Sequence, residues 1–215
     1  PGTAPTNWII GGLGTLTQQI VGTGTSGGIS YVDIRISGTT STTQIYIRFD
    51  GATAVAGLNG QTFTFSTWIS PVGGSTSNIT AVSSNANIYD ISSVYLGSII
   101  FSGFPGSVSS QFTRLSGTGT ISQATAAYIQ PQIYLNFASG ATIDITLRIG
   151  LPQLEQGAFP TSVIPTTTAA ATRNADVASI TGTNFSGWYN QSEGTVFAEA
   201  AKLFNGADFN RKWSL

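Results

Sequence analysis

The few charged side chains of this chain are the residues whose spacing first suggests chemistry. Only 8% of its 215 residues are charged, against about 25% in an ordinary soluble domain. Six of the eight charges within residues 1–150 alternate with aliphatic residues: Asp33, Arg35, Arg48, Asp50, Asp144 and Arg148. Because successive side chains of a strand point to opposite faces, these charges are predicted to share the face opposite the aliphatic residues.

Aromatic and amide side chains, Gln132 and Asn136 among them, fall on the same predicted face and indicate two hypotheses for it. Aromatic rings stack on the apolar side of a sugar, and Asp, Arg, Asn and Gln bind its hydroxyls, so the first hypothesis is a carbohydrate-binding surface. Its candidate residues are Tyr31, Asp33, Arg35, Tyr46, Arg48, Trp68, Tyr134, Asp144 and Arg148. In the second hypothesis, Arg–Asp cross-strand pairs only stabilise a solvated or subunit-facing sheet.

Catalysis and metal binding find weaker support in the sequence. Asp33 and Asp144 could form the carboxylate pair of a glycosidase. Each has an arginine two or four residues away on the same face, so salt bridging is the preferred interpretation, and we predict that the protein is not an enzyme. No cofactor is predicted. A structural calcium ion could be held by Asp and carbonyl oxygens at a sandwich edge, although no spacing indicates one.

Composition excludes several other functions. The chain has no Cys and no His, which rules out disulfides, a thiol nucleophile and a Ser-His-Asp triad. A net charge of −1 provides no electrostatic footprint for nucleic acid. The longest apolar runs are too short to span a membrane. The chain begins at Pro1 and has no Met, so we expect a processed product or part of a longer protein.

Period-2 alternation dominates the elements that must position these side chains. The predicted strands are residues 28–37, 44–50, 61–70, 79–82, 94–101, 111–115, 128–137 and 142–150. Short strands between Gly/Ser/Thr turns predict an all-β fold, an antiparallel jelly-roll β-sandwich. Pro131 inside one strand predicts a sheet edge or a bulge, since proline cannot donate to a ladder. Whether residues 1–27 pair in this sandwich is left open.

The predicted organisation changes after Gly150. Residues 1–150 are expected to form the sandwich, and residues 151–177 an extended Pro/Thr/Ala connector. Residues 178–215 carry many aromatic side chains but are too few to form their own core. They are expected to begin an incomplete second β domain or to dock on another subunit.

Several stretches together resemble a module of tail and fibre proteins of tailed bacteriophages. They are Tyr31-Val-Asp-Ile-Arg-Ile-Ser-Gly-Thr39, Ile143-Asp-Ile-Thr-Leu-Arg-Ile-Gly-Leu-Pro-Gln-Leu-Glu155, Gly157-Ala-Phe-Pro-Thr-Ser-Val-Ile-Pro-Thr166 and Ala171-Thr-Arg-Asn-Ala-Asp-Val177. The module is similar to the jelly-roll carbohydrate-binding modules that accompany glycan-degrading enzymes. Asn184-Phe-Ser-Gly-Trp-Tyr-Asn190 and Glu193-Gly-Thr-Val-Phe197 resemble the start of a concanavalin-like or laminin-G-like sandwich, which would need well over 100 further residues.

The resemblance implies a virion protein of the tail-fibre or spike type that adheres to host surface polysaccharide. It also implies other virion proteins as partners and a homo-oligomer, typically a trimer. From the composition, neither nucleic acid nor a membrane is expected as a partner. No sugar-contacting position is carried over from the family, so the candidate residues rest on strand alternation alone. The alternatives are a purely structural adaptor, spacer or capsid-decorating module, and a polysaccharide depolymerase.

Overall fold

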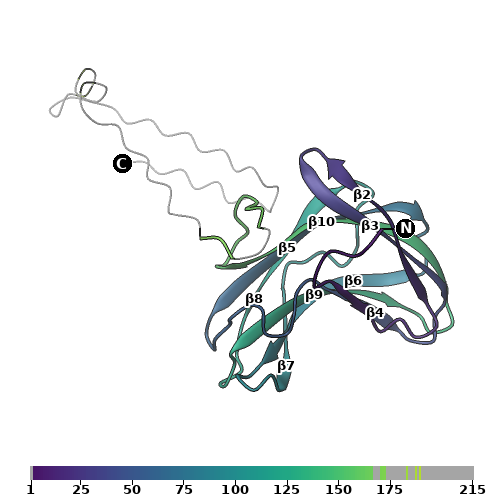
Figure 1. Ribbon diagram of the computed structural model, residues 1–215, viewed down its shortest axis with the longest axis horizontal. Coiled ribbons are helices and arrows are strands. Elements are labelled where there is room, and N and C mark those ends of the chain that lie inside the picture. The colour runs from purple at the N-terminus through teal and green to yellow at the C-terminus, as the bar shows by residue number, and fades with distance from the viewer. Residues whose placement is uncertain (1, 167–169, 173–182, 184–186, 188, 190–215) are drawn as a thin grey trace. The chain divides into compact units, whose positions relative to one another are not determined.

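The computed structural model describes residues 2–166, 170–172, 183, 187 and 189 (Figure 1). The chain divides into two compact units, Pro1–Ala169 and Ala170–Leu215. All strands of the described part belong to the first unit. The predicted tail 178–215, apart from three residues, and most of the predicted connector after Thr166 lie outside the described residues.

Ten strands within the described residues form two antiparallel five-stranded sheets, which confirms the predicted all-β sandwich (Figure 1). Sheet A has the order β1 (Ile9–Gly11), β4 (Gln44–Arg48), β9 (Tyr128–Phe137), β6 (Ile79–Tyr89) and β7 (Tyr95–Ile100). Sheet B has the order β2 (Thr17–Ser26), β3 (Ile29–Thr39), β10 (Thr142–Gln156), β5 (Thr62–Gly74) and β8 (Thr113–Thr120). The N-terminal residues belong to the sandwich, because β1 adds to sheet A and β2 adds to sheet B.

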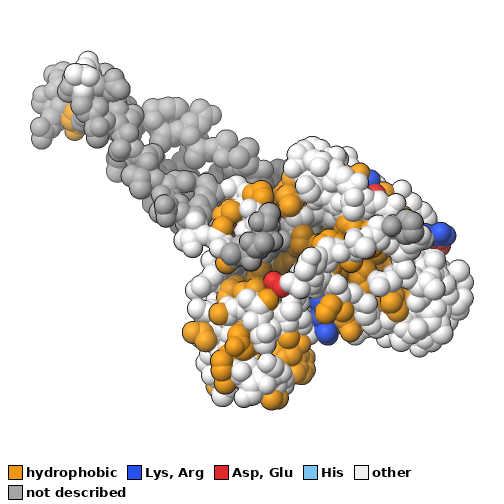
Figure 2. All heavy atoms as spheres, in the orientation of Figure 1, with side chains coloured by type: hydrophobic (Ala, Val, Ile, Leu, Met, Phe, Trp, Pro, Cys, Tyr) orange, Lys and Arg blue, Asp and Glu red, His pale blue; other side chains and the backbone are white. Residues whose placement is uncertain are grey.

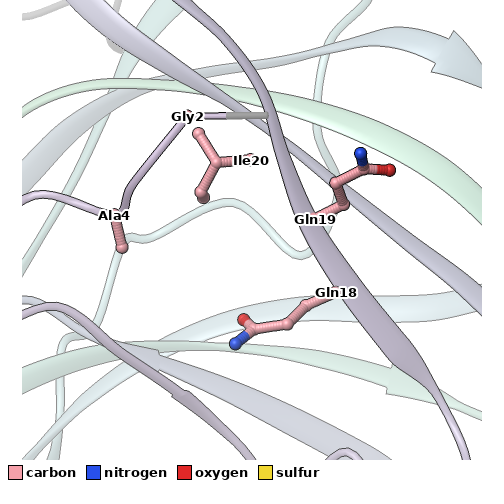
Figure 3. Close-up of a pocket in the computed structure, with 5 residues that line it drawn as sticks. All are labelled: Gly2, Ala4, Gln18, Gln19 and Ile20. Atoms are coloured by element: carbon pink, nitrogen blue, oxygen red, sulfur yellow. The ribbon is translucent and has the colours of Figure 1, made fainter.

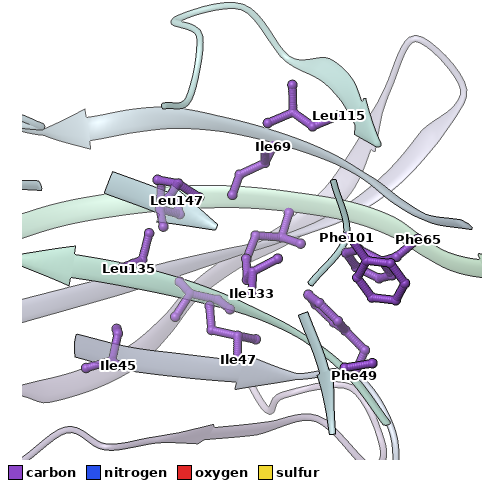
Figure 4. Close-up of a cluster of buried hydrophobic side chains, with 14 of the residues drawn as sticks. Ile45, Ile47, Phe49, Phe65, Ile69, Phe101, Leu115, Ile133, Leu135 and Leu147 are labelled. Carbon is purple, nitrogen blue, oxygen red and sulfur yellow. The ribbon is translucent and has the colours of Figure 1, made fainter. Parts of the chain in front are cut away.

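The core lies between the sheets and is made by the aliphatic half of each alternating strand (Figure 4). Ile45 and Ile47 of β4, from sheet A, and Ile145 and Leu147 of β10, from sheet B, are all fully buried in this core. Phe65 of β5 stacks on Phe49 and Phe101 with ring centroids 5.3 and 5.7 Å apart. Burying one such side chain contributes about 1.5–3 kcal/mol, so the alternation fixes which face of each strand remains for function.

The proline expectation for β9 is wrong: this strand lies inside sheet A, between β4 and β6. Pro131 is paired with Ala86 of β6. Its carbonyl accepts the Phe49 amide, which follows the last residue of β4. In an antiparallel pair the nitrogen and carbonyl of one residue face the same neighbour, so the missing N–H of Pro131 faces Phe49, one residue past the end of β4, where the ladder has already stopped.

The sandwich also extends past the expected boundary at residue 150, because β10 ends at Gln156. The expected boundary lies after Gly150, where the Pro/Thr/Ala composition predicts an extended connector. In the structure, the pairing of β10 with β5 shifts between Gly150 and Gln153, and Leu151 adopts a positive φ of 39°. This bulge takes up Pro152 without ending the strand.

Candidate functional site

The nine candidate residues lie on two different surfaces. Asp33, Arg35, Asp144 and Arg148, with Tyr31 and Trp68, occupy the outer side of sheet B, which we call the ion-pair face. Tyr46, Arg48 and Tyr134 occupy the outer side of sheet A, which we call the amide face. Alternation correctly placed all nine opposite the aliphatic core residues. However, the nine residues do not form the single surface that it suggested, because the core separates the two outer sides.

Two bidentate ion pairs dominate the ion-pair face. Arg148 donates to Asp33 from Nε and Nη2, both at 2.9 Å. Arg35 donates to the Asp144 carboxylate at 2.9 and 3.0 Å. Both pairs join β3 to β10. The structure thus shows that these aspartates form salt bridges, and that each arginine partner lies on the neighbouring strand and not on the strand of the aspartate.

These ion pairs make Asp33 and Asp144 unsuited to act as the general acid of a hydrolase. The hydrogen bond from Arg35 holds the pKa of Asp144 below its ordinary value, whereas a catalytic acid needs a raised pKa. Both oxygens of each carboxylate are already occupied by a guanidinium. The geometry therefore gives no support to the depolymerase alternative.

The aromatic rings of the ion-pair face are already in contact with cationic side chains. The Arg148 guanidinium lies 3.6 Å from the centroid of Tyr31, and the Arg114 guanidinium lies 5.0 Å from that of Trp68. The hydroxyl end of the Tyr31 ring also lies against Gly24, where a Cβ would be 2.7 Å from the hydroxyl oxygen. These contacts take up ring surface that would be needed to stack a sugar.

The segment that follows β10 covers another part of the ion-pair face. Glu155 accepts hydrogen bonds from the amide and hydroxyl of Thr161, whose carbonyl accepts one from Arg114. The Gln153 side chain accepts the amide of Ile164 at 3.0 Å. We call residues 157–164 the strap. Beneath it the outward-facing Thr64 is fully buried, and its hydroxyl donates to the carbonyl of Gly157.

The amide face carries a hydrogen-bond network centred on Gln132, in which Arg48 is the charged member. The Oε1 of Gln132 accepts a hydrogen bond from Nε of Arg48 at 3.1 Å. Its Nε2 donates to Asn85 Oδ1 and Asn87 Oδ1 at 2.8 and 2.9 Å and lies 3.1 Å from the Tyr134 hydroxyl. Gln132 has no exposed surface although it points away from the core, so its neighbours are held in fixed orientations.

The network continues across sheet A on either side of Gln132. Tyr89 donates to Gln130 Oε1 at 3.0 Å, and Ser98 donates to Asn87 Oδ1 at 2.9 Å. At the β4 end, the Arg48 guanidinium lies over Tyr46, 4.1 Å from the ring centroid. The amide face thus has polar side chains on four neighbouring strands and aromatic rings at its borders.

Sequence reasoning missed Asn85, Asn87, Tyr89 and Gln130. It predicted the strand from Ile79 only as far as Val82, whereas β6 extends to Tyr89. The available signal was the alternation of Ser83, Asn85 and Asn87 with Ser84, Ala86 and Ile88. It is weak because small and polar residues occupy both faces.

Other features of the described residues offer little chemistry. A recess of about 310 Å³ beside β2 is lined by Gly2, Ala4, Gln18, Gln19 and Ile20 (Figure 3); none of the nine candidates lines it. In the described part of the chain, no three Asp, Glu, His or Cys residues are grouped to hold a metal ion. Nor does any helix within that part have the length and apolar character needed to cross a membrane.

Comparisons with known proteins find likeness in structure alone. No family model and no curated protein sequence matches the chain. A carbohydrate-binding module of the β-sandwich superfamily has a TM-score of 0.48 at 15% identity, covering 70% of this chain and 57% of that one. The CBM22-1 xylan-binding domain of Paenibacillus barcinonensis Xyn10C has a TM-score of 0.45 at 12% identity, covering 72% and 88%.

A third similar structure is the enzymatically active domain of tailspike protein 4 from bacteriophage CBA120. Its TM-score is 0.41 at 13% identity, and the match covers 70% of this chain but only 19% of the tailspike chain. At these levels of likeness, the function of the present chain has to be argued from its own geometry.

Proposed function

We propose that the sandwich binds glycans through the amide face. The observation that carries this proposal is the fixed set of amide, hydroxyl and guanidinium groups around Gln132, whose side chain is fully buried. Polar groups held by a rigid sheet are preorganised, so they lose little conformational entropy when a hydroxyl-rich ligand binds. In Figure 2 the lower outline of the sandwich is indented between the ends that carry β7 and β4, and a basic side chain lies at the indentation.

The other outer face is a poorer candidate for the same ligand. Its carboxylates are saturated by arginines and its aromatic rings contact guanidinium groups. Of the nine candidate residues, we therefore retain Tyr46, Arg48 and Tyr134 in the proposed site. Asn85 joins them from β6.

A glycan array probed with the protein and two variants tests this proposal. Asn85→Ala removes an amide from the amide face, and Trp68→Ala removes the ring from the ion-pair face. We expect binding that Asn85→Ala weakens about tenfold, the effect of one lost hydrogen-bonding side chain. Loss on Trp68→Ala with full binding by Asn85→Ala would place the glycan on the ion-pair face instead.

We further propose that the chain is part of a bacteriophage virion, in a tail fibre or spike that contacts the host surface. The support is the resemblance of residues 143–177 to phage tail and fibre modules. Several weak sites on one particle would together give high avidity, so a modest affinity per sandwich suffices for adhesion. Immunogold labelling of the parent phage with an antibody against the sandwich tests this location; particles that stay unlabelled would contradict it.

A second candidate function, a structural adaptor that binds protein and no sugar, is favoured by an exposed apolar group at the β7 edge. Ile91, Val94, Tyr95 and Ile100 are exposed by 76, 56, 56 and 72%. Apolar side chains exposed together often mark protein contacts, and a homo-oligomer or other virion proteins would be the partners. If this candidate holds, Ile91→Lys should lower the oligomeric mass in sedimentation, and the unmodified protein should bind no glycan on the array.

A further inference from the structure

Arg48 is the one arginine in the described residues that makes no ion pair. Arg35, Arg114 and Arg148 contact Asp144, Glu155 and Asp33 at 2.9, 3.7 and 2.9 Å. The nearest carboxylate in sequence, Asp50, instead accepts hydrogen bonds from Gly51 and Asn7. In a chain with so few charges, an uncompensated cation on the proposed binding face needs an explanation.

The Arg48 guanidinium is held in place by uncharged groups. Its Nε is bound by Gln132, and its plane lies over the Tyr46 ring. Within the described residues, Nη1 and Nη2 have no hydrogen-bond partner, and neither is among the buried unsatisfied atoms, so both reach solvent. An arginine fixed through Nε presents its two terminal nitrogens side by side, in the geometry that binds a carboxylate bidentately.

The amide oxygens of the network are used internally, and within the described part of the chain one further amide donor near Arg48 remains free. The side-chain carbonyl oxygens of Gln132, Asn85, Asn87 and Gln130 all accept hydrogen bonds from within the network. The Nδ2 of Asn85 has no partner among the described residues. Around Gln132, the free groups of Arg48 and Asn85 are therefore hydrogen-bond donors, and a ligand that binds them must supply acceptor atoms.

These donors are spaced along one cross-strand row. Arg48 of β4 is paired with Gln132 of β9, which is paired with Asn85 of β6. Neighbouring strands lie about 4.8 Å apart, so Arg48 and Asn85 stand roughly 10 Å from each other. A sugar chain lying along this row would place a carboxylate on Arg48 and the hydroxyls of a unit further along the chain near Asn85.

We propose that the amide face selects acidic glycans, with Arg48 binding the carboxylate of a uronic acid residue. This inference rests on the proposed function, because it names the ligand class for the same face. It gives Gln132 a role as a positioning residue, since it orients both Arg48 and Asn85 from beneath without reaching solvent.

Two forms of one polymer test this inference: polygalacturonate and its highly methyl-esterified form, in which the carboxylate is neutral. We expect the unmodified protein to bind the acid form at least about tenfold more tightly, as a charge-assisted bidentate contact should provide. That preference should fade as salt rises from about 0.05 to 0.5 M, because the charge pairing is screened. Arg48→Gln should bind both forms equally, and Arg48→Lys should keep only part of the preference.

The variants separate the two proposals. One outcome would overturn the acidic-ligand inference and leave glycan binding in place. In it, the unmodified protein binds both polymers equally, Asn85→Ala loses this binding, and Arg48→Gln keeps it. Binding that neither variant weakens, or no binding to either polymer or to the glycan array, would overturn both. Denaturation midpoints of Arg48→Gln and Arg48→Lys close to that of the parent would show that their losses are not losses of folding.

Discussion

At the scale of single residues, the ion-pair face shows how an alternating sequence becomes a set of paired charges. Asp33 and Arg148 are direct cross-strand partners, whereas Arg35 reaches Asp144 diagonally, because its own partner in the register is Thr146. The sequence identified the charged side and the option of cross-strand pairing. It could not identify the partners, because the pairing of β3 with β10 joins residues more than 100 positions apart.

The Asp33–Arg148 pair is expected to contribute measurably to stability because it is largely shielded. The side chains are 14 and 22% exposed. Asp33→Asn should lower the free energy of unfolding by about 1–3 kcal/mol, since Arg148 would remain part-buried without a carboxylate. Urea denaturation at neutral pH measures this loss.

Asp144→Asn is the matched control, because its pair with Arg35 is about half exposed and solvent weakens it. The loss from Asp144→Asn should be the smaller of the two. A larger loss than that of Asp33→Asn would contradict the assignment of the shielded pair as the stronger one.

A pH dependence follows from the depressed pKa of Asp144. Because the folded pKa lies below the ordinary value of 3.8, this carboxylate stabilises the fold above pH 3.8, and the contribution is lost as the pH falls through the folded pKa. An NMR titration of the Asp144 side-chain carboxyl should show a midpoint below 3.8, and Arg35→Gln should raise it. An unchanged midpoint in Arg35→Gln would show that Arg35 is not the cause.

At the scale of elements, the two sheets share one arrangement of a glycine, a tyrosine and an arginine that supports the tyrosine ring. A glycine on the neighbouring strand leaves room for a tyrosine ring, and an arginine lies over that ring. The sets are Gly24, Tyr31 and Arg148 on sheet B, and Gly11, Tyr46 and Arg48 on sheet A. Covering a strand glycine with a cross-strand aromatic ring stabilises the pairing. Alternation predicted the tyrosines and arginines, but the glycines are found only once the register is known.

Gly11→Ala should disturb the support of Arg48. A Cβ at Gly11 would lie 2.4 Å from Cζ and Oη of Tyr46, so the ring must move. We expect a loss of about 1 kcal/mol in stability, from overpacking at a half-exposed edge strand. Two-dimensional NMR should show shifts of the Tyr46 ring protons and of the Arg48 Nε proton.

Gly106→Ala is a suitable control, because an added Cβ would meet nothing within 4 Å. It should leave both sets of NMR signals in place. Unmoved Tyr46 signals in Gly11→Ala would show that the ring does not depend on this glycine.

Most strand positions were predictable, and the exceptions have physical reasons. Tyr128–Phe137 was predicted to the residue, and the starts of β4, β6 and β10 were also correct. Pro131 misled because a proline in a central strand is tolerated where the partner strand ends. The composition after Gly150 misled because a bulge takes up Pro152 without ending β10. Both depend on neighbouring strands, which local sequence does not show.

At the scale of the whole molecule, the nine candidate residues illustrate what one strand alone cannot reveal. Alternation separates the core side from the outer side, but a sandwich has two outer sides. The assignment of β4 and β9 to sheet A and of β3, β5 and β10 to sheet B depends on strand order. Sequence therefore predicted the outward direction of Tyr46 and Tyr31 but not that the sandwich separates them.

The extent of the sandwich gives a prediction for the whole domain. A fragment of residues 1–169 should unfold at the same urea midpoint as the sandwich transition of the full chain, because the compact unit ends at Ala169. A fragment of residues 1–150 loses the pairing of Gln153–Gln156 with β5, and Arg114 loses Glu155. Removing the partner of a largely buried ion alone costs about 3–5 kcal/mol, so its midpoint should fall clearly. Equal midpoints for the two fragments would show that the fold is complete at residue 150.

The position of β10 has a mechanical consequence. β10 is the middle strand of sheet B, held on both sides by antiparallel neighbours, and the chain continues from it into the strap. Tension applied downstream would first have to detach the strap. It would then act along the axis of β10 and load its ladders to β3 and β5 in shear, all at once, instead of opening them one bond at a time. A sandwich anchored through such a strand is built to stay folded while it is pulled.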